Sequence, residues 1–151
     1  MNALTIRPLC ESELDALLGL YAHLHEKDAP LPSRAEVEAV WREMLANPRI
    51  TVLGGFVGEA LACACVLSLT PNLTRGCRPY ALIENVVTRP DFRRQGHGRA
   101  LLEAAQARAW AAGCYKAMLL TGRKAEAVLN FYESAGFDRH AKQAFYIAAP
   151  D

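Results

Sequence analysis

The chain has 151 residues, 52% of them hydrophobic, and a formal net charge of +1 at pH 7. This length and composition suit one domain, residues 1–151, with a single substantial core. The near-zero charge argues against binding to nucleic acid or an acidic membrane. The sequence has neither a signal-peptide apolar stretch nor the roughly 20 apolar residues of a membrane span. We therefore predict a cytoplasmic protein with no nucleic-acid or membrane partner.

The first half of the sequence predicts a strand, two helices and a β-hairpin. The run LTIRPL alternates as a short strand does, and a helix begins at Ser12. Ser33 and Glu36 form a capping box that starts a second helix, which ends near Asn47. The runs ITVLGGF and ALACACVLSL flank a turn at 57–59, which is typical of a hairpin.

The second half predicts alternating strands and helices. The strand ALIENVVT precedes a helix from Gly98 to Ala112, with Gly113 as its C-terminal cap. The run YKAMLLTG predicts another strand, a last helix spans 125–135, and 145–147 predicts a final short strand. This order gives an α/β fold, a mixed central sheet with helices on both faces.

The five cysteines predict free thiols, because no CxxC pair occurs and no histidine lies at zinc-ligand spacing. Cys63 and Cys65 are two residues apart in a predicted strand, so their side chains share one face. We interpret them as small buried hydrophobic residues, and we predict no metal site.

The run RRQGHG, residues 93–98, separates a predicted strand from a predicted helix. A helix N-terminus leaves backbone N–H groups unpaired and attracts anions, and glycines let the backbone approach a phosphate. Arg93, Arg94 and Arg99 add positive charge. An ordinary turn with solvated arginines is the alternative. Neither GK[ST] nor a third glycine follows, which excludes a P-loop and a dinucleotide-binding fingerprint.

With its flanks, this run resembles the signature of the GNAT superfamily of acyl-CoA-dependent N-acyltransferases, Arg/Gln-x-x-Gly-x-Gly/Ala. Arg93, Gly96 and Gly98 fill that pattern, and ENVVTRPDF resembles the strand and turn that precede it. The run LNFYESAGF resembles the family's FYxxxGF element. The resemblance is strong over 81–137 and elsewhere rests on element order. It implies a GNAT-type fold and an N-acetyltransferase with acetyl-CoA as cosubstrate, and it allows for a homodimer.

The resemblance also implies how CoA is held. Backbone amides of 94–99 would bind the pyrophosphate, and the backbone of 86–88 would bind the pantetheine arm where two strands splay apart. Many members carry an asparagine seven residues before the FY tyrosine; this chain has Ala125 there, with Asn130 or Lys124 as substitutes. The implied cofactor-binding residues are Val86, Val87, Thr88, Arg93, Arg94, Gln95, Gly96, His97, Gly98, Arg99 and Asn130.

Acyl transfer from a thioester to an amine needs a neutral amine, a stabilised oxyanion and a proton for the thiolate. The resemblance implies that Tyr132 is the general acid; a core aromatic with a satisfied hydroxyl is the alternative. Glu84 lies in an otherwise apolar strand, where a carboxylate is costly. It is a candidate base for the amine, and a solvated or ion-paired glutamate is the alternative. We expect His97 to be exposed.

Family members build the acceptor site from the connection between the first two helices and the loop before the strand at 81–88. These segments supply His23, His25, Glu26, Asp28, Arg75, Arg78 and Tyr80. Arg75 and Arg78 favour a small-molecule amine that carries a carboxylate, such as an amino acid or related metabolite. A protein amine is an alternative acceptor. A non-catalytic CoA-binding regulator is an alternative function, against which Tyr132 and Glu84 both argue.

Overall fold

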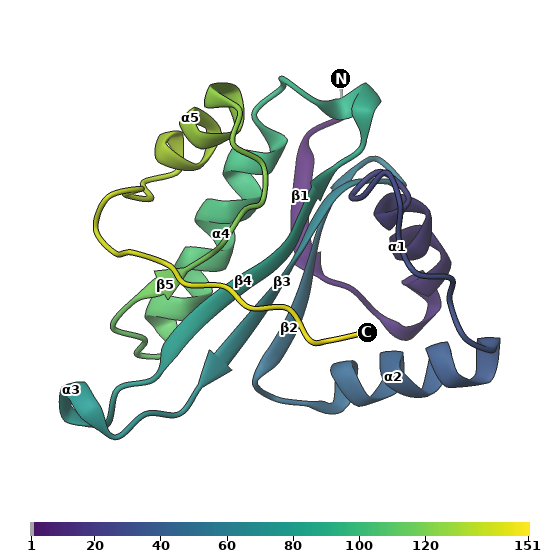
Figure 1. Ribbon diagram of the computed structural model, residues 1–151. Helices are drawn as coiled ribbons and strands as arrows, with labels where there is room; N and C mark the ends of the chain where they lie inside the picture. Colours follow the sequence, from purple (N-terminus) through teal and green to yellow (C-terminus); the bar gives the residue numbers. More distant parts are fainter. Residues whose placement is uncertain (1) are drawn as a thin grey trace.

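The computed structural model describes residues 2–151, which form a five-stranded sheet with helices on both faces (Figure 1). The strands lie side by side in chain order. They are β1 (Leu4–Pro8), β2 (Ile50–Val57), β3 (Ala60–Thr70), β4 (Tyr80–Thr88) and β5 (Ala117–Met118). The first four pair antiparallel, and β5 pairs parallel to β4. The mixed α/β sheet predicted from the sequence is therefore confirmed.

Helices α1 and α2 cover one face of the sheet, and α4 and α5 cover the other (Figure 1). The helical elements are η1 (Glu11–Glu13), α1 (Leu14–Tyr21), α2 (Arg34–Ala46), α3 (Thr74–Cys77), η2 (Pro90–Phe92), α4 (His97–Ala111) and α5 (Glu126–Ser134). The predicted capping box of Ser33 and Glu36 is present at the start of α2. Gly113 follows α4 with φ of 82°, as a C-terminal cap requires.

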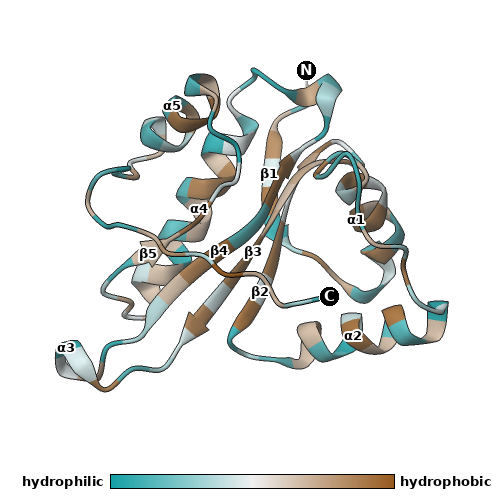
Figure 2. Cartoon of the chain, viewed as in Figure 1, coloured by the Kyte–Doolittle hydropathy of each residue, from teal (hydrophilic) through white to brown (hydrophobic). Residues whose placement is uncertain are grey.

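Buried apolar residues form a core cluster on each face of the sheet. Figure 2 shows the hydrophobic residues along the strands and helices in brown. Leu53 of β2 packs with Leu101 of α4, whereas the adjacent Val52 packs with Leu17 of α1 and Trp41 of α2. Neighbouring strand residues point to opposite faces, so one strand serves both cores. Each fully buried side chain of this kind contributes about 1.5–3 kcal/mol to stability.

Cys63 and Cys65 of β3 are fully buried in the same core. Burial raises the pKa of Cys63 to about 11 and that of Cys65 to about 12. Both thiols therefore stay protonated at neutral pH, and their interpretation as buried hydrophobic residues is confirmed. No group of three or more His, Cys, Asp or Glu side chains within residues 2–151 is arranged to hold a metal ion.

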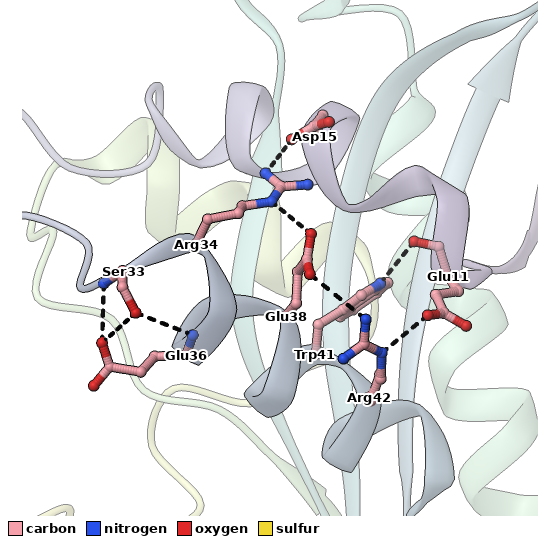
Figure 3. Close-up of polar contacts among 8 residues, drawn as sticks. All are labelled: Glu11, Asp15, Ser33, Arg34, Glu36, Glu38, Trp41 and Arg42. Atoms are coloured by element: carbon pink, nitrogen blue, oxygen red, sulfur yellow. Dashed lines mark hydrogen bonds and ion pairs between the residues drawn. The ribbon is translucent and has the colours of Figure 1, made fainter.

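Helix α2 is fastened to η1 and α1 by a buried tryptophan and surrounding ion pairs (Figure 3). The Trp41 indole N–H donates to the Glu11 carbonyl oxygen at 3.1 Å. Arg34 pairs with Asp15 of α1 at 2.5 Å and with Glu38 of its own helix at 2.9 Å. Exposed pairs each contribute only about 0.2–1 kcal/mol, so burial of Trp41 dominates this contact.

Two predicted strands differ from the structure. The strand predicted over 115–122 is reduced to Ala117–Met118, because the chain beyond it diverges from β4. The strand predicted over 145–147 is wrong. Phe145, Tyr146 and Ile147 are 92%, 86% and 93% exposed and pair with no strand among the described residues. Strand-forming side chains become a strand only where a sheet edge is available to them.

Among residues 2–151, no helix is both long enough and apolar enough to pass through a bilayer.

Candidate active site

The centre of the site is a bend in β4 where the sheet opens. Asn85 has a left-handed φ of 52°, and with Val86 it opposes the single residue Cys65 of β3 in a β-bulge. β5 meets β4 only at 81–82. In the described chain, the β4 edge over 83–88 therefore has no strand partner on the β5 side.

A cavity of about 800 Å³ occupies this opening. Its walls come from β4, the start of α4, the segment between β5 and α5, helix α5, and the segment after α1. The predicted site residues that line it are Glu84, Val86, Val87, Thr88, Arg93, Arg94, Gly96, His97, Gly98, Arg99 and Tyr132. The structure thus brings the two sequence motifs together at one place.

Two predicted cofactor residues do not line this cavity. The Gln95 side-chain amide donates from Nε2 to the Asp91 carbonyl oxygen at 3.2 Å. The Asn130 side-chain oxygen accepts from Arg139 at 3.1 Å. Both side chains therefore hold neighbouring parts of the protein.

The loop before α4, whose residues line the cavity except for Gln95, carries a row of unpaired backbone N–H groups. Arg94 has φ of 62° and Gly96 has φ of 81°. Left-handed residues alternating with other conformations curve the backbone into an anion-binding concavity. Across residues 2–151, the N–H groups of 94–99 find no backbone or side-chain acceptor. These donors and the positive end of α4 together suit an anion such as a phosphate.

The arginines at this loop differ in what their side chains do. Arg93 donates to the Thr88 carbonyl oxygen at 3.1 Å, which ties the loop to the end of β4. Arg99 pairs with Glu103 at 2.8 Å. The guanidinium of Arg94 has no hydrogen-bond or ion-pair partner anywhere in the described residues. Arg94 is therefore the loop's available cation.

Gly96 and Gly98 are needed for different reasons. A Cβ at Gly96 would meet nothing within 4 Å, but its φ of +81° strains any other residue. A Cβ at Gly98 would lie 3.0 Å from the Phe131 ring and 3.2 Å from the Thr88 hydroxyl. Gly96 therefore shapes the loop, while Gly98 lets α4 pack closely against α5 and β4.

Tyr132 projects from α5 into the cavity and is half-buried. Its ring centroid lies 5.0 Å from that of Phe131 and 6.4 Å from that of Phe137. Burial raises the pKa of the Tyr132 hydroxyl, and nearby Arg123 partly opposes this rise. The hydroxyl accordingly holds its proton at neutral pH, as a general acid must.

Glu84 lines the same cavity from β4. Its residue is exposed, so the burial cost inferred from its apolar strand does not apply. Among the ion pairs of residues 2–151, none involves Glu84. Its carboxylate therefore faces the cavity without a cation partner among the described residues.

His97 is not exposed as expected. The residue is only partly exposed at the start of α4, and its ring centroid lies 6.1 Å from that of Phe92 in η2. Its Nε2 atom is buried and has no hydrogen-bond partner within the described chain.

The predicted acceptor residues divide into two groups. His23 and His25 line the cavity, whereas Glu26, Asp28, Arg75, Arg78 and Tyr80 do not. Arg78 donates to the carbonyl oxygens of Gly113 and Cys114 at 3.1 and 3.0 Å. Helix α3, which carries Arg75, lies at the opposite end of β4 from the loop before α4 (Figure 1). Neither arginine faces the cavity, so this geometry gives no support to the acceptor role predicted for them.

Arg123 was missed by the sequence reasoning. It lies between β5 and α5, lines the cavity, and donates from Nη2 to the Leu24 carbonyl oxygen at 3.0 Å. No motif marks this residue. The one sequence feature that could have pointed to Arg123 is its position directly after the strand predicted to end at Gly122. That position places it at the same end of the sheet as the loop before α4.

Comparison with known proteins supports the assignment of the motifs. The model of the acetyltransferase (GNAT) family matches residues 15–137. Glucosamine 6-phosphate N-acetyltransferase from Trypanosoma brucei brucei is 35% identical over 147 residues, which cover 93% of this chain and 92% of that protein.

Solved structures agree. A protein from Agrobacterium tumefaciens str. C58 assigned as an acetyltransferase is 41% identical, with a TM-score of 0.89 over 96% of this chain and 99% of that chain. A Trypanosoma brucei acetyltransferase is 32% identical, with a TM-score of 0.79 over 97% of this chain and 100% of that chain. This chain belongs to the GNAT family and is an acetyltransferase.

Proposed function

We propose that this protein transfers the acetyl group of acetyl-CoA to a primary amine of a small molecule. The observation that carries the proposal is the meeting, in one cavity, of the unpaired N–H groups of 94–99, the free edge of β4 and Tyr132. These features match the three parts of an acyl-CoA: a phosphate, an extended amide-containing arm and a thioester.

In this proposal the N–H groups of 94–99 bind the CoA pyrophosphate, with Arg94 as the adjacent cation. The pantetheine arm lies along 86–88 and bonds to backbone groups, so their side chains remain free to pack. The side chains of Gln95 and Asn130 have no part, because other residues hold them.

The reaction then follows from the two groups beside the opening. The neutral amine attacks the thioester carbonyl carbon, and a C–N bond forms in a tetrahedral intermediate. Glu84 accepts the amine proton, directly or through water. The C–S bond breaks as the intermediate collapses, and Tyr132 protonates the departing thiolate. The products are the N-acetylated amine and CoA.

The acceptor we propose is a small metabolite, and an amino sugar phosphate is the first candidate. The relative that is 35% identical over nearly the whole chain is a glucosamine 6-phosphate N-acetyltransferase. An amino acid is a second candidate, as predicted from the sequence. A protein amine and a purely regulatory role remain alternatives to exclude by experiment.

A homodimer also stays a prediction. Its support is the run of exposed apolar side chains at 145–147, because contiguous exposed apolar groups commonly mark an interface. Light scattering after size exclusion would measure the mass of the particle in solution.

The test is release of the CoA thiol from acetyl-CoA across a panel of amines, with product mass measured in parallel. We expect release that depends on the amine, with one N-acetylated product per thiol. Measurable CoA binding without turnover on any amine would favour the regulator. Turnover on peptide amines alone would favour a protein acceptor.

A further inference from the structure

Arg123 is an arginine in the cavity wall with hydrogen-bonding capacity to spare. Its Nη2 donates to the Leu24 carbonyl oxygen and so joins the segment between β5 and α5 to the segment after α1. Its other guanidinium N–H groups have no partner within residues 2–151. They can therefore donate to a bound ligand.

Arg123 has no carboxylate partner among the described residues, unlike six other arginines of the chain. The arginines that pair with a carboxylate are Arg7, Arg34, Arg42, Arg89, Arg99 and Arg139. Of the described residues that line the cavity, Glu84 is the one carboxylate, and it forms no ion pair with Arg123. The positive charge of Arg123 is left uncompensated in the protein.

The place of Arg123 links this charge to the reacting groups. Arg123 lies close enough to Tyr132 to lower the pKa of its hydroxyl, against the larger effect of burial. His23 and His25, which precede and follow Leu24 in the sequence, both line the cavity. Arg123 donates a hydrogen bond to the Leu24 carbonyl oxygen. Three basic side chains from two different segments thus line the cavity that also holds the proposed acid.

We propose that Arg123, assisted by His25, binds an anionic group on the acceptor amine, a phosphate or a carboxylate. The inference rests on the proposed function, in which the N–H groups of 94–99 already take the CoA pyrophosphate. A guanidinium with free N–H groups binds either anion through paired, charge-assisted hydrogen bonds. Arg123 thereby takes the role that the sequence had suggested for Arg75 and Arg78.

The experiment compares matched acceptors that differ in their anionic group. One pair is glucosamine 6-phosphate and glucosamine, and the other is glycine and glycinamide. Arg123→Gln should raise KM for the anionic member of the preferred pair about 10- to 100-fold, the effect of losing hydrogen bonds to a charged group. KM for its neutral partner and the Kd of acetyl-CoA should stay at the wild-type values. Arg123→Lys should restore part of the affinity.

Arg49→Gln is the matched control, because Arg49 is exposed and does not line the cavity. Its kinetics should equal those of wild type. An equal effect of Arg123→Gln on both members of each pair would overturn the proposal, as would a weaker Kd for acetyl-CoA. The preferred pair identifies the anion as phosphate or carboxylate.

Calorimetry separates failure of this inference from failure of the proposed function. Glucosamine 6-phosphate is titrated into the CoA-loaded protein and into its Arg123→Gln variant. If glucosamine 6-phosphate binds in a way that depends on Arg123 but no amine is turned over, the proposed function is contradicted and the anion site is supported. If neutral and anionic amines are turned over with equal KM, the proposed function is supported and the anion site is contradicted.

Discussion

At the scale of single residues, Tyr132 is the side chain on which the proposed chemistry depends most. Its ring packs between Phe131 and Phe137, so Tyr132→Phe removes an oxygen and preserves the packing. We predict that kcat falls about 10- to 10⁴-fold, because a thiolate is already a fair leaving group. The Kd of acetyl-CoA should change little, since the hydroxyl acts as charge develops on sulfur. Steady-state rates at saturating acetyl-CoA test this prediction, and the melting temperature of each protein is the folding control. If the chemical step limits the rate and the variant has the same kcat as wild type, Tyr132 is only a packing residue.

A second prediction at the scale of single residues concerns the proposed role of Glu84 as general base. Loss of a general base through Glu84→Gln should lower kcat about 10²- to 10⁴-fold and leave the Kd of acetyl-CoA near wild type. Glu59→Gln, in the exposed turn between β2 and β3, is the control for removing one carboxylate. Normal kcat in Glu84→Gln would move the base role to water or to another side chain.

Glu13 makes a prediction about stability rather than catalysis. It accepts hydrogen bonds from Arg7 and from the Cys10 backbone N–H, and the Arg7 bond is the main cause that lowers the pKa of Glu13 from 4.5 to about 2. A depressed folded-state pKa stabilises the protein above pH 4.5, and this contribution is lost as pH falls toward 2.

Glu13→Gln should therefore destabilise the protein by about 1 kcal/mol at pH 7. The gap between wild type and variant should close between pH 4.5 and 2. Urea unfolding at several pH values measures it; a gap that stays constant with pH would contradict the pairing.

At the scale of elements, the start of α4 separates two glycines that the motif treats alike. Gly98→Val inserts a side chain against Phe131 and Thr88 and should destabilise the fold by about 1–3 kcal/mol. Gly96→Val meets open space but strains the loop at φ of +81°. It should chiefly weaken acetyl-CoA binding. Thermal melts and calorimetry on both variants test this division; identical profiles would refute it.

Elements with local signals could be predicted from the sequence. The capping box of α2, the hairpin of β2 and β3, and the glycine cap of α4 each depend on neighbouring residues, and all are present. The short β5 and the unpaired 145–147 could not be predicted, because strand length depends on where the partner edge lies.

The candidate site, too, could be predicted from the sequence only where a local motif marks the residue. The positions of Tyr132 and Gly96 followed from motifs, whereas the approach of Arg123 to Leu24 joins residues 99 apart in the chain. The burial of the His97 Nε2 atom, beside the ring of Phe92, is likewise visible only in the folded chain. Such contacts arise from the fold, and single-residue patterns do not encode them.

At the scale of the whole molecule, a sheet with a core on each face is opened at one place. The bulge at Asn85 and the early end of β5 expose the edge of β4, and α4 and α5 enclose the resulting space. The loop proposed to bind the pyrophosphate and the proposed acid reach this space from the start of α4 and from α5. The central claim is that acetyl-CoA occupies it, with its pyrophosphate on the N–H groups of 94–99.

The most direct measurement is an NMR titration of ¹⁵N-labelled protein with acetyl-CoA, followed at the backbone amides. The account predicts that the 94–99 amide signals shift saturably on titration. The 86–88 amide signals of β4 should shift too, and all of these shifts should fit one Kd. The amides of α2, on the other side of the sheet, should not move. Saturable binding that leaves the 94–99 amides unshifted, or no binding at all, would contradict the account.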